Sequence, residues 1–177
     1  MLVIDKYKHM LILQEVGGVS MNKDTPGSRS RCHCTALRKA SRRISHLYDL
    51  ALAPSGLKAT QRAILAKIAR LESTTVGALA EAMVMEAGGL AHTLKPLVRD
   101  GLVSIGPDPN DKRSRAIKLT AAGKARLRQS EKLWDTAQQV FEKQLGRDQV
   151  QVLNQAIGLL ISDGFGDKFE SAITASG

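Results

Sequence analysis

Two thiols stand close together near the start of a basic helical segment. One residue, His33, separates Cys32 from Cys34, and Arg38 and Arg42 follow them. A thiol near the start of a helix and close to arginines is favoured as the thiolate, which is the form that reacts with oxidants. Cys32 would point away from Cys34 on a helix, and could pair with it only if residues 30–33 are extended or across two copies of the chain. The pattern therefore suggests oxidation of Cys34, with inert thiols as the alternative.

Other chemistry finds little support in the sequence. Cys32, His33 and Cys34 make a poor metal site, because adjacent residues cannot easily share one tetrahedral ion and further ligands are not evident. The chain has no glycine-rich phosphate loop, no metal-spaced histidine pair and no recognisable nucleophile motif. We therefore expect neither an enzyme nor a bound metal or cofactor.

The basic excess of the chain is local. The 177 residues have a formal charge of +9. Residues 29–62 hold eight cationic side chains against Asp49 alone, and residues 95–118 hold six against three anionic ones. Two basic blocks around a nearly neutral helical segment favour an anionic partner, because a charge kept for solubility would be spread. Since only 3% of the residues are aromatic, stacking on single-stranded bases is disfavoured and duplex DNA is the expected partner.

The N-terminal region and the cysteine content bear on location. No run approaches the roughly 18 apolar residues of a membrane helix, and the first residues lack the features of a secretory signal. Two cysteines are too few for a disulfide framework, so we expect a cytoplasmic protein. Residues 1–30 are expected to be a flexible extension. Met21 is a second candidate start, which would leave residues 1–20 outside the native chain.

Hydrophobic spacing predicts a mainly α-helical fold. Helices are expected over about 32–52, 59–71, 76–83, 86–100, 121–144 and 148–162. Around a charged, turn-rich segment, residues 102–105 and 116–120 read as two short strands, which predicts a two-stranded wing. Thr120 is placed to cap the long helix after the wing, and Gly101 to end the helix before it. Residues 163–177 are expected to be a mobile tail or an arm laid on a partner.

The two ends of the chain have more apolar helical surface than a winged core needs. This surplus predicts a dimer in which both ends pack together. The expected architecture is a winged helix-turn-helix core at about 57–120, with N- and C-terminal dimerisation helices at about 32–52 and 121–162. Together they make one domain over 31–162.

Several short motifs match one family in their order and spacing. They are Tyr48-Asp49 with Leu52, Gly56-Leu57 with Thr60 and Gln61, Ile64-Leu65, Leu79-Ala80, Leu94-Lys95-Pro96-Leu97, Gly101-Leu102-Val103, Asp111 with Arg113 and Arg115, and Leu119-Thr120 with Gly123. Over residues 32–162 the chain resembles the MarR family of winged helix-turn-helix regulators. The resemblance implies a homodimeric transcriptional regulator, expected to be a repressor, that binds double-stranded DNA at a pseudo-palindromic operator.

The resemblance also suggests where DNA would be contacted. The helix at 86–100 would enter the major groove and the wing the neighbouring minor groove. Arg113, oriented by Asp111, and Arg115 are expected in the minor groove, whose negative potential attracts arginine. Phosphate contacts, which position the protein without reading sequence, are expected from Lys112, Lys95 and Arg99. Thr60, which lies outside the helix at 86–100 and outside the wing, is also expected to contact DNA.

The residues of the helix at 86–100 that would face the major groove differ from those of the family. At these positions the family has polar residues, including arginine. Gly88 and Gly89 have no side-chain donors, and Ala91 can make only an apolar contact, for instance with a thymine methyl. His92 and Thr93 are left as the side chains able to hydrogen-bond a base edge. The glycines would weaken the helix by about 1 kcal/mol each. Two interpretations are open: close backbone approach to DNA, or a helix that orders fully on binding.

The family further implies a small phenolic or anionic effector, bound between the dimerisation helices and the DNA-binding lobe. Its cleft could be lined by Arg38, Arg42, His46, Tyr48 and Arg62, since paired arginines suit a carboxylate. The alternative is that these residues form a basic outer face or intersubunit ion pairs.

The run from Cys34 to Tyr48 is similar to the organic hydroperoxide sensors of the family, in which a tyrosine matching Tyr48 hydrogen-bonds the oxidised cysteine. Arg38 stands where those sensors have a second tyrosine, and no distant cysteine is present. Oxidation of Cys34, with Cys32 as its partner, is therefore our second hypothesis after a small-molecule effector. A different class stays open as well: a winged-helix interaction module, or a loosely specific DNA-binding protein.

Overall fold

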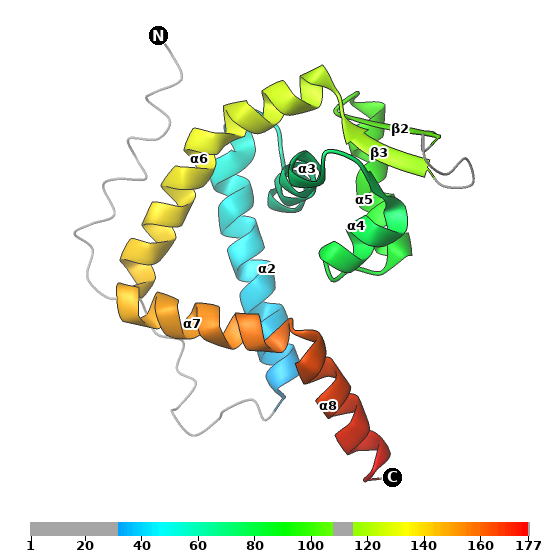
Figure 1. Ribbon diagram of the computed structural model, residues 1–177. Helices are drawn as coiled ribbons and strands as arrows, with labels where there is room; N and C mark the ends of the chain where they lie inside the picture. Colours follow the sequence, from blue (N-terminus) through cyan, green and yellow to red (C-terminus); the bar gives the residue numbers. More distant parts are fainter. Residues whose placement is uncertain (1–31, 108–114, 177) are drawn as a thin grey trace, which may run out of the picture. The chain divides into compact units, whose positions relative to one another are not determined.

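A computed structural model describes residues 32–107 and 115–176 of the chain (Figure 1). The expected N-terminal extension over 1–30 lies outside this part. The chain divides into two compact units, residues 1–40 and 41–177, so the boundary falls within the first described helix.

The element order is that of a winged helix flanked by long helices. The helices are α2 (His33–Leu52), α3 (Ala59–Leu71), α4 (Val76–Ala82), α5 (Ala87–Arg99), α6 (Ala121–Leu145), α7 (Arg147–Leu160) and α8 (Asp163–Thr174), with a 3-10 turn η2 (Ala53–Ser55). The strands are β1 (Thr74–Thr75), β2 (Val103–Pro107) and β3 (Arg115–Leu119). The predicted mainly helical, winged fold is confirmed.

One small sheet carries the wing. The strand order is β1-β3-β2, and both pairs are antiparallel. The hairpin prediction is confirmed by β2 and β3, which pair from Val103↔Leu119 to Pro107↔Arg115. The two-residue strand β1 was not expected, because Ser73 to Thr75 reads as a capping turn. Thr75 also caps α4, where its hydroxyl accepts a hydrogen bond from the Ala78 N–H (3.2 Å).

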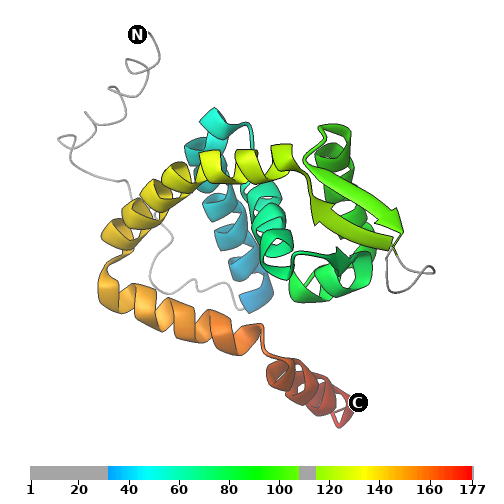
Figure 2. The same ribbon diagram turned by 45° about the horizontal axis from the view of Figure 1, so that its top comes forward.

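The core lies where α3, α4 and α5 meet the sheet. Figures 1 and 2 both show α5 beside the hairpin. Apolar side chains at three- and four-residue spacing turn inward from each helix, as an amphipathic pattern requires. The fully buried ones include Ile64, Leu65, Ile68, Leu79 and Leu90, and they pack with the fully buried Ile117 of β3.

A close backbone contact joins the wing to α6. The Thr120 hydroxyl accepts a hydrogen bond from the Gly123 N–H (3.0 Å), which confirms the predicted cap. The Leu102 carbonyl accepts the Thr120 N–H (3.2 Å). A Cβ at Gly123 would stand 2.0 Å from that same carbonyl oxygen. Gly101 has φ +68° at the end of α5, as expected for a helix-ending turn.

Residues 163–174 form a helix, where we expected a mobile tail or an arm on a partner. The Ser162 hydroxyl caps α8 by accepting the Phe165 N–H (3.3 Å), and Asp163 adds an acidic residue to the first turn. Neither α7 nor α8 contains a buried residue.

Candidate nucleic-acid interface

The outer face of α5 carries a stripe of exposed residues. Leu90, Leu94 and Leu97 turn into the core. Gly88, His92, Lys95 and Arg99 follow one another at spacings of four, three and four, so they share the opposite face. All four are exposed. The first turn of this face is therefore bare, and the following turns carry cationic or titratable groups.

This face of α5 borders a groove of about 690 Å³. The groove, called here the α2–α3–α5 groove, has polar side chains from three helices and Pro96 as an apolar part of its wall. Its lining residues are Ser45, Asp49, Lys58, Thr60, Gln61, His92, Thr93, Lys95, Pro96 and Arg99. The structure thus brings together Thr60, His92, Thr93 and Lys95, which the sequence suggested separately. A groove lined by three Lys and Arg against one carboxylate suits a polyanion.

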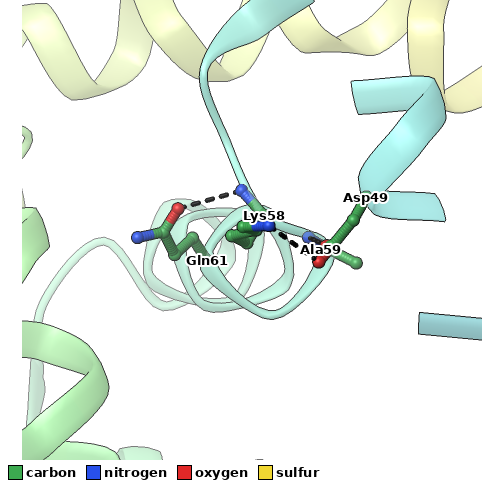
Figure 3. Close-up of polar contacts among 4 residues, drawn as sticks. All are labelled: Asp49, Lys58, Ala59 and Gln61. Atoms are coloured by element: carbon green, nitrogen blue, oxygen red, sulfur yellow. Dashed lines mark hydrogen bonds and ion pairs between the residues drawn. The ribbon is translucent and has the colours of Figure 1, made fainter. Parts of the chain in front are cut away.

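Asp49 caps the start of α3 from a neighbouring helix (Figure 3). Its Oδ1 accepts the Ala59 N–H (2.7 Å), and its Oδ2 lies 3.3 Å from the Lys58 Nζ. The Lys58 N–H in turn donates to the Gln61 Oε1 (2.9 Å). We did not single out Lys58 as a site residue or Asp49 as a cap. The signal was present, because Asp49 is the only acid of the first basic block.

Side chains on α5 differ in what they can still offer a ligand. The Thr93 hydroxyl donates to the Gly89 carbonyl (3.0 Å), so its hydrogen is already used within the helix and its oxygen can only accept. The Arg99 Nε lies 2.9 Å from the Asp100 Oδ1, and this hydrogen bond raises the pKa of the exposed arginine. His92 is exposed beside Lys95 in the groove. It therefore lines the groove together with Lys95 and is not an isolated exposed side chain.

Neither Gly88 nor Gly89 is required by the fold. A Cβ added at either position would meet nothing within 4 Å. Neither residue is among the glycines with positive φ, which are Gly56, Gly101 and Gly146 in the described ranges. Side chains could therefore be accommodated at both positions. The reason for these glycines lies outside the packing and backbone geometry of the described part.

The wing shows part of its expected contact surface. Arg115 is exposed on β3 and pairs with Pro107, at the loop end of the hairpin. Lys118, also exposed on β3, adds a cation that we did not single out. Asp111, Lys112 and Arg113 lie outside the described residues.

Among the residues expected to bind an effector, Tyr48 and Arg62 come together. Tyr48 and Arg62 meet at the same side chain of α6: the Tyr48 and Trp134 ring centroids are 5.0 Å apart, and the Arg62 Cζ lies 4.3 Å above the indole. Arg42 and His46 are exposed on α2, and Arg38 belongs to the first unit. Trp134 contacts both Tyr48 and Arg62, and nothing in the sequence had indicated it.

Polar contacts fix this cluster. The Tyr48 hydroxyl donates to the Gln138 Oε1, and the Arg62 Nε donates to the Oγ of fully buried Ser130 (3.2 Å). Loss of hydration raises the pKa of Tyr48 and lowers that of Arg62, whose charge Asp135 and Glu131 partly support. The cluster joins α2 and α3 to α6.

Cys32 is the cysteine that the start of α2 perturbs. Its Sγ accepts hydrogen bonds from the Thr35 hydroxyl (3.1 Å) and the Thr35 N–H (3.4 Å). These bonds, led by the hydroxyl, lower the pKa of the Cys32 thiol. Both cysteines are exposed. We had given Cys34 the leading redox role, and the geometry gives Cys32 a specific reason to be reactive.

Thr35→Val should slow the alkylation of Cys32 at neutral pH. Losing the hydroxyl donor raises the thiol pKa toward its ordinary value. The labelling rate should therefore begin to rise only at a higher pH than in the parent protein. The measurement is the pH profile of iodoacetamide labelling in a Cys34→Ser background, with Thr35→Ser as the control that keeps a hydroxyl. Identical profiles for all three proteins would show that Thr35 does not control the thiol.

Neither a metal cluster nor a membrane-spanning helix occurs in the described part of the chain. Residues 32–107 and 115–176 contain no group of three or more His, Cys, Asp or Glu side chains that could hold a metal ion. Within the same ranges, no helix is long and apolar enough to cross a membrane.

Known proteins share this arrangement. The MarR family model matches residues 57–114, a range that contains α3, β1, α4, α5 and β2. M. tuberculosis transcriptional regulator MosR, solved in complex with DNA, is 35% identical, with 72% of this chain and 96% of that chain covered and a TM-score of 0.61. The chain belongs to the MarR family. Its winged core is thus that of a MarR-family transcriptional regulator. The family is one of transcription regulators, which are not enzymes.

Two more solved structures agree with this membership. A cysteine-to-serine mutant of MarR from E. coli, complexed with operator DNA, is 27% identical and has a TM-score of 0.66, with coverage of 73% of this chain and 93% of that one. The transcriptional repressor CouR, bound to a 23-mer DNA duplex, supports the fold at 24% identity and a TM-score of 0.69, with coverage of 77% and 96%. No curated protein matched the sequence.

Proposed function

We propose that this MarR-family protein is a homodimeric, sequence-specific DNA-binding repressor that recognises a pseudo-palindromic operator. The observation that carries the proposal is the exposed stripe of α5, which borders the basic α2–α3–α5 groove and lies beside a hairpin bearing Arg115. A helix fits the major groove of DNA, and an arginine-bearing hairpin fits the minor groove next to it. DNA-bound structures of the similar proteins MosR and E. coli MarR support this placement.

Within this proposal, the contacts divide by role. Lys95, Arg99, Lys112 and Thr60 hold phosphates, and Arg113 and Arg115 enter the minor groove. His92 is the base-reading side chain with a donor to offer. Thr93 contributes an acceptor, because its hydrogen is bound to Gly89. Gly88, Gly89 and Ala91 give a bare surface on which the helix backbone approaches the bases.

Dimerisation is supported by the apolar surface at the C-terminal end. Ile157 and Ile161 stand one turn apart and are 43% and 60% exposed. Phe169 and Ile173 on α8 are 56% and 60% exposed. Helices of 14 and 12 residues with amphipathic patterns and no buried residue need a partner to cover them. A second copy, related by a twofold axis, would cover them and supply the second DNA-reading helix.

The MarR-type domain covers residues 31–162 in this proposal, and the protein acts in the cytoplasm. Its effector is a small phenolic or anionic molecule. The aromatic cluster of Tyr48, Arg62 and Trp134 supports an effector site at the junction of α2, α3 and α6. An aromatic acid could replace the indole under the Arg62 guanidinium, because both present a flat face to the cation. Oxidation at Cys34 or Cys32 is the second trigger.

The test is selection of duplexes by the protein from a random-sequence library, followed by binding to a selected duplex and to random DNA. A specific regulator should prefer the selected duplex by roughly 10³ or more at physiological salt. Arg115→Ala should weaken binding while the melting temperature stays unchanged. Equal affinity for selected and random DNA would refute operator recognition and favour the loosely specific alternative, which the bare first turn of α5 suggests.

Replacement of Gly88 and Gly89 by Ala separates the effect of the two glycines on folding from their effect on the approach of α5 to DNA. Each Ala should stabilise α5 by up to about 1 kcal/mol, since helix propensity improves and there is room for the methyl group. If the glycines permit close approach, the same variant should bind the selected duplex more weakly despite its higher melting temperature. The idea fails if the variant becomes more stable and keeps full affinity.

A further inference from the structure

Asp49 breaks a local rule of helix chemistry. It lies in the last turn of α2, which contains no basic residue. The carbonyl end of a helix carries partial negative charge, so an acid there is unfavourable for α2 itself. Residues that violate local preferences often serve a contact made elsewhere. Here the carboxylate is three-quarters buried and directed at the start of α3.

The contacts of Asp49 are of two separable kinds. Oδ1 takes the Ala59 N–H at 2.7 Å, one of the backbone donors that the first turn of a helix leaves unsatisfied. Oδ2 pairs with the Lys58 ammonium at 3.3 Å, but that lysine side chain is 70% exposed, so the ion pair contributes little. The hydrogen bond to Ala59 is therefore the stronger of the two contacts by which Asp49 ties the start of α3 to α2.

The corner between α2 and α3 is otherwise fixed away from the groove. The Ser55 hydroxyl donates to the Leu52 carbonyl (2.7 Å), and the Arg126 guanidinium of α6 donates to the Ser55 carbonyl (3.0 Å). These bonds hold the turn η2, and the hydrogen bond from Arg62 to Ser130 ties the start of α3 to α6 and not to α2. Asp49 is the link that ties the first turn of α3 to α2, at the wall of the α2–α3–α5 groove.

We propose that Asp49 is a positioning residue for operator binding, which acts by holding the N-terminal turn of α3 against α2. This inference rests on the proposed function, in which α2 belongs to the dimer interface and α3 and α5 to the DNA-binding lobe. The Ala59 N–H bond then sets where each lobe stands relative to the dimer axis. The spacing of the two half-sites that a dimer accepts depends on that placement.

The test uses a duplex selected by the wild-type protein and a derivative with one base pair inserted between its half-sites. Asp49→Ala should lose about tenfold in affinity for the selected duplex, similar to one mismatched base pair. It should also discriminate less between the two duplexes. Asp49→Asn keeps an oxygen for the Ala59 N–H, so its affinity should stay within about twofold and its spacing preference should be retained. The matched charge control is Asp148→Asn, on the exposed first turn of α7.

A second variant keeps the proposal testable if Asp49→Ala folds poorly. Asp49→Glu keeps the charge and both oxygens but is one methylene longer, so it should weaken the spacing preference while circular dichroism confirms a folded protein. The proposal is overturned if Asp49→Ala, or Asp49→Glu where the first does not fold, retains the spacing preference. It is also overturned if Asp49→Ala and Asp49→Asn tighten binding to selected and random DNA alike, because Asp49 would then act only by its charge. A wild-type protein without any preference would overturn operator recognition itself.

Discussion

Replacing Ile157 and Ile161 together by Asp is expected to convert the protein to a monomer. Both side chains are exposed in the single chain, so the new carboxylates cost little there. In the proposed dimer they would be buried without partners, which is strongly unfavourable for each charge. Affinity for the selected duplex should fall on the order of 100-fold, because one lobe must then bind a half-site without the other. Sedimentation velocity and titration of labelled duplex measure the two effects.

The control for this prediction lies on the same helix. Gln151 and Gln155 are also one turn apart and exposed, but on a different face of α7. Their replacement by Asp adds the same charge and should leave both the dimer and DNA binding nearly unchanged. If the isoleucine variant stays dimeric, α7 is not the interface. If both variants lose affinity equally, the effect is added negative charge and not dissociation.

Gly123→Ala should destabilise the fold strongly. The new Cβ would overlap the Leu102 carbonyl oxygen at 2.0 Å, and that oxygen already accepts the Thr120 N–H. Backbone on both sides must move, so we expect a loss of about 3 kcal/mol in the free energy of unfolding, at the upper end for overpacked sites. The melting temperature should fall by roughly 6–12 °C for a chain of this length.

Gly77→Ala provides the comparison for the Gly123 prediction. Gly77 is exposed in α4, and a Cβ there meets nothing within 4 Å. The same chemical change should leave the melting temperature unchanged or raise it slightly. Thermal denaturation followed by circular dichroism compares the variants. A Gly123→Ala protein as stable as the wild type would show that the junction of wing and α6 adapts without strain.

The features that the sequence predicted well are those with local causes. The Thr120 cap needs only the Gly123 N–H three residues on, and the turn at Gly101 needs only a positive φ. Inward residues such as Leu90 and Leu94 follow from helical periodicity alone. The strands of the wing were marked by a change of period around a polar turn. These choices are made within a few residues, so the sequence shows them directly.

The features that the sequence missed depend on distant partners. The bond from Ala59 to Asp49 joins two helices, and β1 exists because Thr74 and Thr75 pair with β3. Four of the expected effector residues were chosen for their place on the first helix and Arg62 for its place on the second, and packing brings Tyr48 and Arg62 to a distant side chain, Trp134. For α8, the Ser162 cap is a local signal that our interpretation did not use. The DNA contacts of the α2–α3–α5 groove stay a prediction.

The position of Trp134 has a practical consequence. It is the single tryptophan of the chain, and its ring contacts both the Tyr48 ring and the Arg62 guanidinium. Its emission therefore comes from one place, the junction where α6 meets α2 and α3. A molecule that entered this junction, or a rearrangement of the three helices, would change the fluorescence of the unlabelled protein. The fold thus contains its own optical probe of the region that a regulatory signal would have to cross.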